Sequence, residues 1–208
     1  MSHQSNKYKR NVGQRSVRKV LIVCEGAKTE HNYFKAFQTS GELIRVEILG
    51  AGRNKDSLVE YTIELKKKAE IKEPYASVWC VFDRDSYPID SKDKHKFNRA
   101  IKLARNNQIQ AAYSNDAFEI WYILHFHYHQ TALERSKYES KLTDLLGSKY
   151  KKSDETMYVK LKDKQLDAIR HSKQLLAYYG AKHNPESDNP CTTVHRLVEF
   201  LNDYLEGE

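Results

Sequence analysis

The sequence predicts an α/β protein in which a parallel sheet of about four strands carries helices on both faces and is followed by a C-terminal helical elaboration. Three observations lead to this prediction. The run Val20–Cys24 is apolar throughout and ends at Glu25 and Gly26, and a second apolar run at 78–82 ends at Asp83. Short runs rich in β-branched residues are typical of strands buried on both faces of a parallel sheet. Helical patterns alternate with these strands, as they do in βαβ units.

The first half of the chain alternates between helical and extended patterns. Ser57 and Glu60 match a capping box, which predicts a helix that starts at Ser57 and runs to about Ile71. The neighbouring segments show aromatic residues at helical spacing, strict alternation of polar and apolar residues, or a charged helical stripe. They predict, in chain order, a helix at about 30–39, a strand at 45–49, the strand at 78–82, a helix at about 93–107 and a weak strand at 109–113.

The second half of the chain is mainly helical by its spacing. An apolar helix is expected at about 117–127, and a charged helical pattern that begins at 131 is ended by Gly147. Helical periodicity returns at about 164–179, and the proline-containing segment that follows reads as a loop. A final helix from Thr192 or Thr193 places its apolar residues on one docked face, and these are Val194, Leu197, Val198, Leu201 and Leu205.

Charge is unevenly distributed along the 208 residues, a length that suits one domain with an elaboration. We expect a flexible basic arm at 1–18, an α/β core at 19–127 and a helical elaboration at 128–208. The first 19 residues hold six of the 35 bases and no acid, which leaves 29 bases against 28 acids elsewhere. Such an arm suits contact with nucleic acid, although a solvated terminus is the simpler explanation. The arm residues that we assign to nucleic-acid binding are Lys7, Lys9, Arg10, Arg15 and Arg18.

Composition excludes several classes of protein. No apolar run approaches the ~20 residues that a membrane-spanning helix needs, so we expect no membrane partner. Residues 1–19 lack the apolar centre of a signal peptide, which favours a cytoplasmic protein. The three cysteines form no Cys-x-x-Cys pair and suggest no disulfide framework, so a thiolate zinc site is not expected.

Three acids follow the two best-defined strands. Asp83 and Asp85 are two residues apart, so on an extended backbone both side chains leave one face while Arg84 points away. Glu25 ends the first strand, and open α/β sheets bind ligands at the carboxyl ends of their strands. Because carboxylates suit Mg²⁺ or Mn²⁺, we predict that Glu25, Asp83 and Asp85 hold one divalent metal. The competing explanation is that the two aspartates cap turns or pair with lysines while Glu25 faces water.

Other polar residues are weaker candidates. Glu119 could hold a second metal or position a substrate, since its spacing from Asn115 would place both residues on one helix face. A carboxylate favoured by the helix dipole explains Glu119 equally well, and this is the better explanation for Glu30. Lys28, in the turn after the first strand, could contact a phosphate together with the amides of the helix start, or it could simply be solvated.

Taken together, these motifs resemble a known pattern. A strand ending in Glu25-Gly26, followed two strands later by one ending in Asp83-x-Asp85, is similar to the Toprim fold, a Rossmann-like metal-binding catalytic domain of topoisomerases, DnaG-type primases and OLD-family nucleases. More narrowly, the chain resembles the RloB family over most of its length beyond the arm. Asp116 departs from that pattern, because relatives are expected to have proline there. The residues that carry the resemblance are Cys24-Glu-Gly-Ala-Lys-Thr-Glu30, Phe82-Asp-Arg-Asp85, Ser114-Asn115, Phe118-Glu119-x-Trp121, Leu124-His125-Phe126 and Asn189-Pro-x-Thr-x-Val194.

The resemblance implies a function, a cofactor and partners. Toprim relatives carry out Mg²⁺-dependent phosphodiester chemistry, which implies that Asp83 and Asp85 are metal ligands and that Glu25 is a ligand or a general acid/base. The RloB family is encoded in bacterial restriction-linked and abortive-infection loci, often beside an AAA-type ATPase. We therefore expect a nuclease of DNA or RNA that acts in phage defence with such an ATPase, and a homo-oligomer is possible. The catalytic candidates are Glu25, Asp83, Asp85 and Glu119.

Two other functions fit the same motifs. A nucleotide-sugar transferase also uses an Asp-x-Asp at a strand end to hold a metal and a diphosphate, and it would not need Glu25. A non-catalytic module that binds nucleic acid or an ATPase would keep the fold around a vestigial site, and it would not bind Mg²⁺ or Mn²⁺ at millimolar levels.

Overall fold

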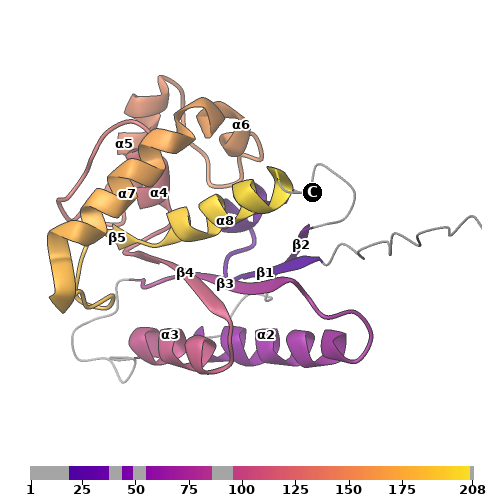
Figure 1. Cartoon of the computed structure of the whole chain (residues 1–208). Coiled ribbons are helices and arrows are strands. Elements are labelled where there is room, and N and C mark those ends of the chain that lie inside the picture. Colours follow the sequence, from indigo (N-terminus) through magenta and orange to yellow (C-terminus); the bar gives the residue numbers. More distant parts are fainter. Residues whose placement is uncertain (1–18, 38–43, 49–54, 86–95, 207–208) are drawn as a thin grey trace, which may run out of the picture.

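A computed structural model of the chain describes residues 19–37, 44–48, 55–85 and 96–206. Its centre is a five-stranded sheet in the order β2-β1-β3-β4-β5, with a layer of helices on each face (Figure 1). The first four strands are parallel, and β5 pairs antiparallel with β4. The predicted α/β class is therefore confirmed. The strands are β1 (Val20–Cys24), β2 (Ile44–Ile48), β3 (Ser77–Asp83), β4 (Gln110–Asn115) and β5 (Cys191–Thr192).

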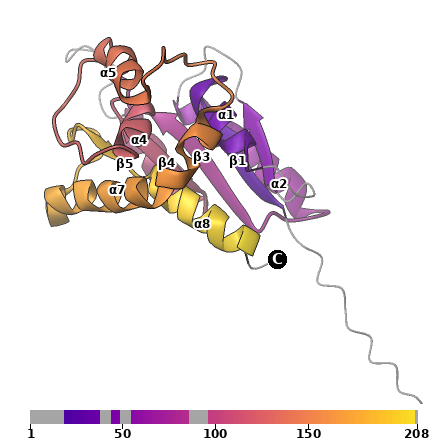
Figure 2. The ribbon, with the colours of Figure 1, turned by 90° about the horizontal axis from the view of Figure 1, so that it is seen from above.

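The helices fall into two unequal layers. Figure 1 shows α2 and α3 below the sheet and the remaining labelled helices above it. Seen from above in Figure 2, α4, α5 and α7 lie on the β4–β5 side of the sheet, α8 runs from that side toward the C mark, and α1 lies beside β1. The helices are α1 (Thr29–Lys35), α2 (Lys55–Glu70), α3 (Lys96–Asn106), α4 (Glu119–Leu124), α5 (Lys137–Leu146), α6 (Met157–Leu161), α7 (Gln165–Tyr179) and α8 (Val194–Glu206), with short 3-10 turns η1 (Lys162–Lys164) and η2 (Gly180–Lys182).

The sheet is the core of the molecule. All five residues of β1 are fully buried, because alternate side chains enter the two apolar layers on either face. Burial of one such aliphatic side chain contributes about 1.5–3 kcal/mol, so this strand alone anchors the fold strongly. Of the residues that the structure describes, no helix combines the length and apolar character that a membrane span requires.

The register of the strands aligns their carboxyl ends. Cys24 of β1 lies opposite Val81 of β3, and Asp83 of β3 lies opposite Ser114 of β4. The ladder continues one residue beyond β1, since the Glu25 backbone N–H donates to the Val81 carbonyl at 2.9 Å. The residues that follow β1, β3 and β4 therefore meet at one edge of the sheet.

Several element boundaries differ from the sequence predictions. Ser57 is the third residue of α2 and not its N-cap, so the predicted capping box is wrong. The apolar helix expected at 117–127 is shortened to α4, and the charged helix expected from 131 begins only at Lys137. Neither α6 nor β5 was predicted, because each is very short and has no periodicity of its own.

The C-terminal part of the chain contributes to the central sheet. Ser114 and Asn115 of β4 pair with the two residues of β5. The final helix, α8, buries Val194, Leu197, Val198 and Leu201, as its apolar spacing predicts. Residues from the last quarter of the sequence thus form the edge strand beside β4 and cover part of the face of the sheet that lies uppermost in Figure 1.

Candidate metal centre

Glu25 lies at the carboxyl end of β1, as the sequence predicts. Its Oε2 accepts a hydrogen bond from the Asp83 backbone N–H at 3.4 Å, which brings the glutamate against the end of β3. Burial raises the pKa of Glu25, and the nearby Asp85 carboxylate acts in the same direction, against the opposing effect of Lys55. The Glu25 side chain therefore reaches the backbone at the end of the third strand.

Asp83, the last residue of β3, is the most deeply buried of the three predicted ligands. Only 7% of the residue is exposed. Its Oδ2 accepts a hydrogen bond from the Phe118 backbone N–H at 2.9 Å, whereas Oδ1 is buried and has no hydrogen-bond partner among the described residues. Burial raises the pKa of Asp83 well above its usual range, and Glu30 and Glu119 add to this effect. One oxygen of this aspartate is thus buried without a hydrogen bond from the residues that the structure describes.

Asp85 departs from the predicted extended backbone. Its φ of 56° lies in the left-handed region, so the chain turns here and the simple same-face argument for Asp83 and Asp85 is wrong. Aspartate tolerates this conformation better than most residues. Its carboxylate binds Lys55 Nζ at 2.9 Å and the guanidinium of Arg135. Although burial acts to raise it, the pKa of Asp85 is lowered by these two cations.

Lys55, the first residue of α2, connects the acids of the first and third strands. Its side chain is only 2% exposed, and Nζ lies 3.4 Å from Glu25 Oε1 and 2.9 Å from Asp85 Oδ2. Glu25 and Asp85 consequently meet around an ammonium group. This arrangement partly bears out the competing explanation in which an aspartate pairs with a lysine. No sequence pattern marked Lys55 or Arg135, because their approach depends on how α2 and the 125–136 connection pack.

Glu30 is a site residue whose surroundings the sequence did not reveal. It belongs to the first turn of α1, where the helix dipole favours an acid, but only 7% of it is exposed. Burial raises its pKa to about 7, and the charges of Glu119 and Glu25 contribute. A Cβ on Gly26 would lie 2.3 Å from Glu30 Oε2, so the glycine makes room for this carboxylate. The dipole alone does not account for Glu30.

Glu119 belongs to the same group of acids but is placed differently from the prediction. It is the first residue of α4, whereas Asn115 is the last residue of β4, so the two do not share a helix face. The Asn115 amide instead donates to the carbonyls of Pro185 and Glu186, at 3.0 and 3.2 Å. Glu119 is buried, accepts a hydrogen bond from the Tyr150 hydroxyl at 3.1 Å and lies 3.4 Å from Lys152 Nζ.

The predicted nucleic-acid contacts are less well defined. Lys28 is exposed at the start of α1, and its ammonium makes no ion pair within the ranges that the structure describes. The five arm residues Lys7, Lys9, Arg10, Arg15 and Arg18 lie outside the described residues. Their assignment to nucleic-acid binding stays a prediction.

The acid group fits a divalent cation in chemistry, although not in the present side-chain positions. No three His, Cys, Asp or Glu side chains among the described residues are arranged to hold a metal ion. At Asp85, Lys55 and Arg135 contact the two carboxylate oxygens. Hard carboxylate donors and the unpartnered Asp83 Oδ1 are nevertheless what Mg²⁺ or Mn²⁺ requires. Exchange of a protein cation for a metal ion would complete the site.

Comparison with protein families gives one match that covers most of the chain. Residues 20–201 match a family model described as RloB-like protein. No curated protein and no solved structure matches the sequence or the fold.

Proposed function

The chain belongs to the RloB-like protein family, and from this premise we propose that it hydrolyses phosphodiester bonds of nucleic acid with a divalent cation. The observation that carries the proposal is the position of Glu25, Asp83 and Asp85 at the carboxyl ends of two neighbouring parallel strands, where Glu25 accepts a hydrogen bond from the Asp83 backbone N–H. Ligands of open α/β sheets bind at this edge. The site would use Mg²⁺ or Mn²⁺.

The neighbouring charges support a cation at Asp83. Glu30 and Glu119 both raise the pKa of Asp83, and burial prevents water from screening them. Such a group of acids costs free energy unless a positive charge joins it. Asp83 and Asp85 are the ligands that we propose, and Glu25, Glu30 and Glu119 are the acids that surround them. When bound, the metal would polarise a phosphoryl oxygen and lower the pKa of a water molecule.

Lys55 and Arg135 have a second role in this proposal. Both cations contact Asp85, and the Arg135 side chain is 41% exposed while that of Lys55 is 2% exposed. The arginine can therefore leave Asp85 without opening the core, whereas the lysine is held in place. Once displaced, the Arg135 guanidinium is positioned to bind a phosphate oxygen, for which its planar donors are well suited. Lys55 would remain beside Glu25 and partly offset the rise in its pKa that burial causes.

Glu25 is the proposed proton carrier. Its side chain is 21% exposed, more than the Asp83 carboxyl, and its pKa is raised by burial. A carboxyl with a raised pKa is better matched to proton transfer near neutral pH than an ordinary one. Replacement of Glu25 should therefore reduce cleavage even where metal binding survives.

The biological setting is also part of the proposal. The resemblance to the RloB family supports a role in bacterial phage defence or abortive infection, in the cytoplasm, together with an AAA-type ATPase. The substrate class is DNA or RNA, including tRNA.

Cleavage of labelled DNA and RNA tests this function. We expect the wild-type chain to cleave at least one of them in Mg²⁺ or Mn²⁺, and Asp83→Asn and Glu25→Gln to lose about 10²-fold or more of the rate. Asp163→Asn, a substitution of an exposed acid in η1, is the matched control and should retain full activity. Equal rates for Asp83→Asn and the control would refute the site.

A non-catalytic binding module is the second candidate. The observation that favours it is the occupation of Asp85 by Lys55 and Arg135, which neutralises the site without a metal. In that case neither Mg²⁺ nor Mn²⁺ would bind at millimolar concentrations, while nucleic acid or an ATPase would still bind.

A further inference from the structure

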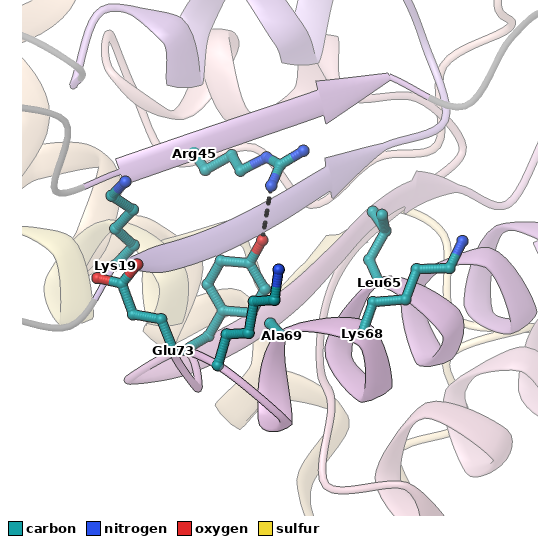
Figure 3. Close-up of a pocket in the computed structure, with 8 residues that line it drawn as sticks. Lys19, Arg45, Leu65, Lys68, Ala69 and Glu73 are labelled. Atoms are coloured by element: carbon teal, nitrogen blue, oxygen red, sulfur yellow. Dashed lines mark hydrogen bonds between the residues drawn. The ribbon is translucent and has the colours of Figure 1, made fainter.

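A basic hollow lies at the opposite end of the sheet from the acids. Lys19 precedes β1, and Arg45 is the second residue of β2, so both stand at the amino ends of strands whose carboxyl ends lead to the acid group. Together with the last turn of α2 and the segment that follows it, they enclose about 340 Å³ (Figure 3). The residues that line it are Lys19, Arg45, Leu65, Lys68, Ala69, Lys72, Glu73 and Tyr75.

Basic side chains outnumber acidic ones in this hollow. Four of the eight lining side chains are basic and only Glu73 is acidic. Lysines near the end of a helix are favoured by its dipole, which explains Lys68. Lys19 and Arg45 come from other segments of the chain, so the dipole does not explain why their charges gather at the same place.

The side chains differ in how firmly they are held. The Arg45 guanidinium donates to Glu47 Oε1 at 2.6 Å and to the Tyr75 hydroxyl at 3.0 Å, the second of which is the dashed line in Figure 3. The ammonium groups of Lys68 and Lys72 are exposed and have no ion pair or hydrogen bond in the described parts of the chain. By contrast, Lys66 on the same helix donates to the Asn107 carbonyl at 2.8 Å. The hollow thus combines an oriented guanidinium with two available ammonium groups.

We propose that this hollow binds backbone phosphates of a nucleic acid, away from the acid group. The inference rests on the proposed function, because it assigns a second contact to the same substrate. The sequence supports it, since residues 1–18, which precede Lys19 in the chain, carry five bases and no acid. Lys19 and Glu25 are six residues apart on an extended strand, a distance of roughly 20 Å. A duplex would cover this length in about six base-pair steps.

The test is a binding measurement that does not depend on catalysis. A fluorescein-labelled 30-nucleotide DNA or RNA is titrated with the full chain in EDTA, and anisotropy is followed from low to high salt. We expect Lys68→Glu/Lys72→Glu to weaken binding roughly tenfold and to reduce the slope of log affinity against log salt by about 2. The neutral variant Lys68→Gln/Lys72→Gln should show a smaller loss in the same direction.

The matched control reverses the same number of lysine charges at positions outside the hollow. Lys102→Glu/Lys182→Glu alters two exposed lysines outside the hollow and should leave the salt slope unchanged. Equal losses in the two double variants, or failure of the wild-type chain to bind either nucleic acid, would overturn the inference. Mn²⁺ affinity of each variant reports on the fold and on the acid group. Normal nucleic-acid binding without cleavage would refute the proposed function and leave this hollow supported.

Discussion

At the scale of single residues, burial and like charges determine the behaviour of Glu30. Its pKa is raised from 4.5 to about 7, first by burial and then by neighbouring acids. The folded chain therefore keeps a proton that the unfolded chain has already lost between these two pH values. By linkage, the contribution of Glu30 to the free energy of unfolding is fully present below about pH 4.5. It is lost as the pH rises through about 7.

Replacement of Glu30 should remove this pH dependence. In EDTA we expect Glu30→Gln to have a free energy of unfolding at pH 8 that is higher than that of the wild-type chain by on the order of 2 kcal/mol, and to show no such gain at pH 4.5. Thermal unfolding across this pH range measures the difference. A gain that is independent of pH would mean that Glu30 is not the titrating group.

Gly26 and Glu30 should be energetically coupled. A methyl group at Gly26 would meet Glu30 Oε2 at 2.3 Å, so Gly26→Ala must displace that carboxylate. We expect Gly26→Ala to be destabilising in the wild-type chain and much less so beside Glu30→Ala, with a coupling of about 0.5–3 kcal/mol. Urea unfolding of the four variants gives this value. Additive effects would show that the glycine is needed for another reason.

The sequence predicts candidate site residues only where an apolar run shows the end of a strand. Glu25 and Asp83 could be predicted because each directly follows a buried apolar run, and parallel strands bring their carboxyl ends to one edge. Glu30, Lys55 and Arg135 could not, since their side chains reach the site through the packing of α1, α2 and the 125–136 connection. Tertiary packing of this kind leaves no local pattern in the sequence.

At the scale of elements, the connection between α4 and α5 places a cation on Asp85. It carries Arg135, whose guanidinium pairs with the Asp85 carboxylate and would compete with the proposed metal for it. We expect Arg135→Gln to raise the affinity for Mn²⁺ by up to about fivefold, because an ion pair of this exposure is worth about 0.2–1 kcal/mol. The same variant should cleave nucleic acid more slowly, since it loses a phosphate contact.

Isothermal titration with Mn²⁺ checks the Arg135 prediction. Arg170→Gln is the control, because Arg170 forms a comparable surface pair with Asp167 at 2.7 Å. Unchanged or weaker Mn²⁺ binding by Arg135→Gln would indicate that the arginine does not compete with the metal.

The last helix is as important to the core as the strands. Leu201 of α8 is fully buried, whereas Leu166 of α7 is 80% exposed. We expect Leu201→Ala to lower the free energy of unfolding by about 2–5 kcal/mol, and Leu166→Ala to change it by no more than about 0.5 kcal/mol. Chemical denaturation compares the two. Similar values for both would show that α8 is not part of the cooperative core.

Elements were predictable in proportion to their length and periodicity. β1 and α7 agree closely with the apolar and helical patterns that predicted them. The start of α2 and the length of α4 could not be predicted, because local hydrogen-bonding signals compete with tertiary contacts at helix ends. β5 has only two residues, and it is defined by its antiparallel pairing with β4.

At the scale of the whole molecule, the parallel sheet separates two kinds of charge. Its carboxyl edge collects buried acids, and its amino edge holds the basic hollow around Arg45. A nucleic acid held by its phosphates at one edge and cleaved at the other would use both. Because the strands are parallel, a single strand length separates the two sites.

Crystals soaked in Mn²⁺ provide the most direct test of the proposed metal centre. Anomalous scattering would locate any bound ion. We predict a peak within coordination distance of Asp83 and Asp85, with the Arg135 guanidinium moved away from Asp85. Absence of a peak at millimolar Mn²⁺, with Lys55 and Arg135 still bound to Asp85, would contradict the account.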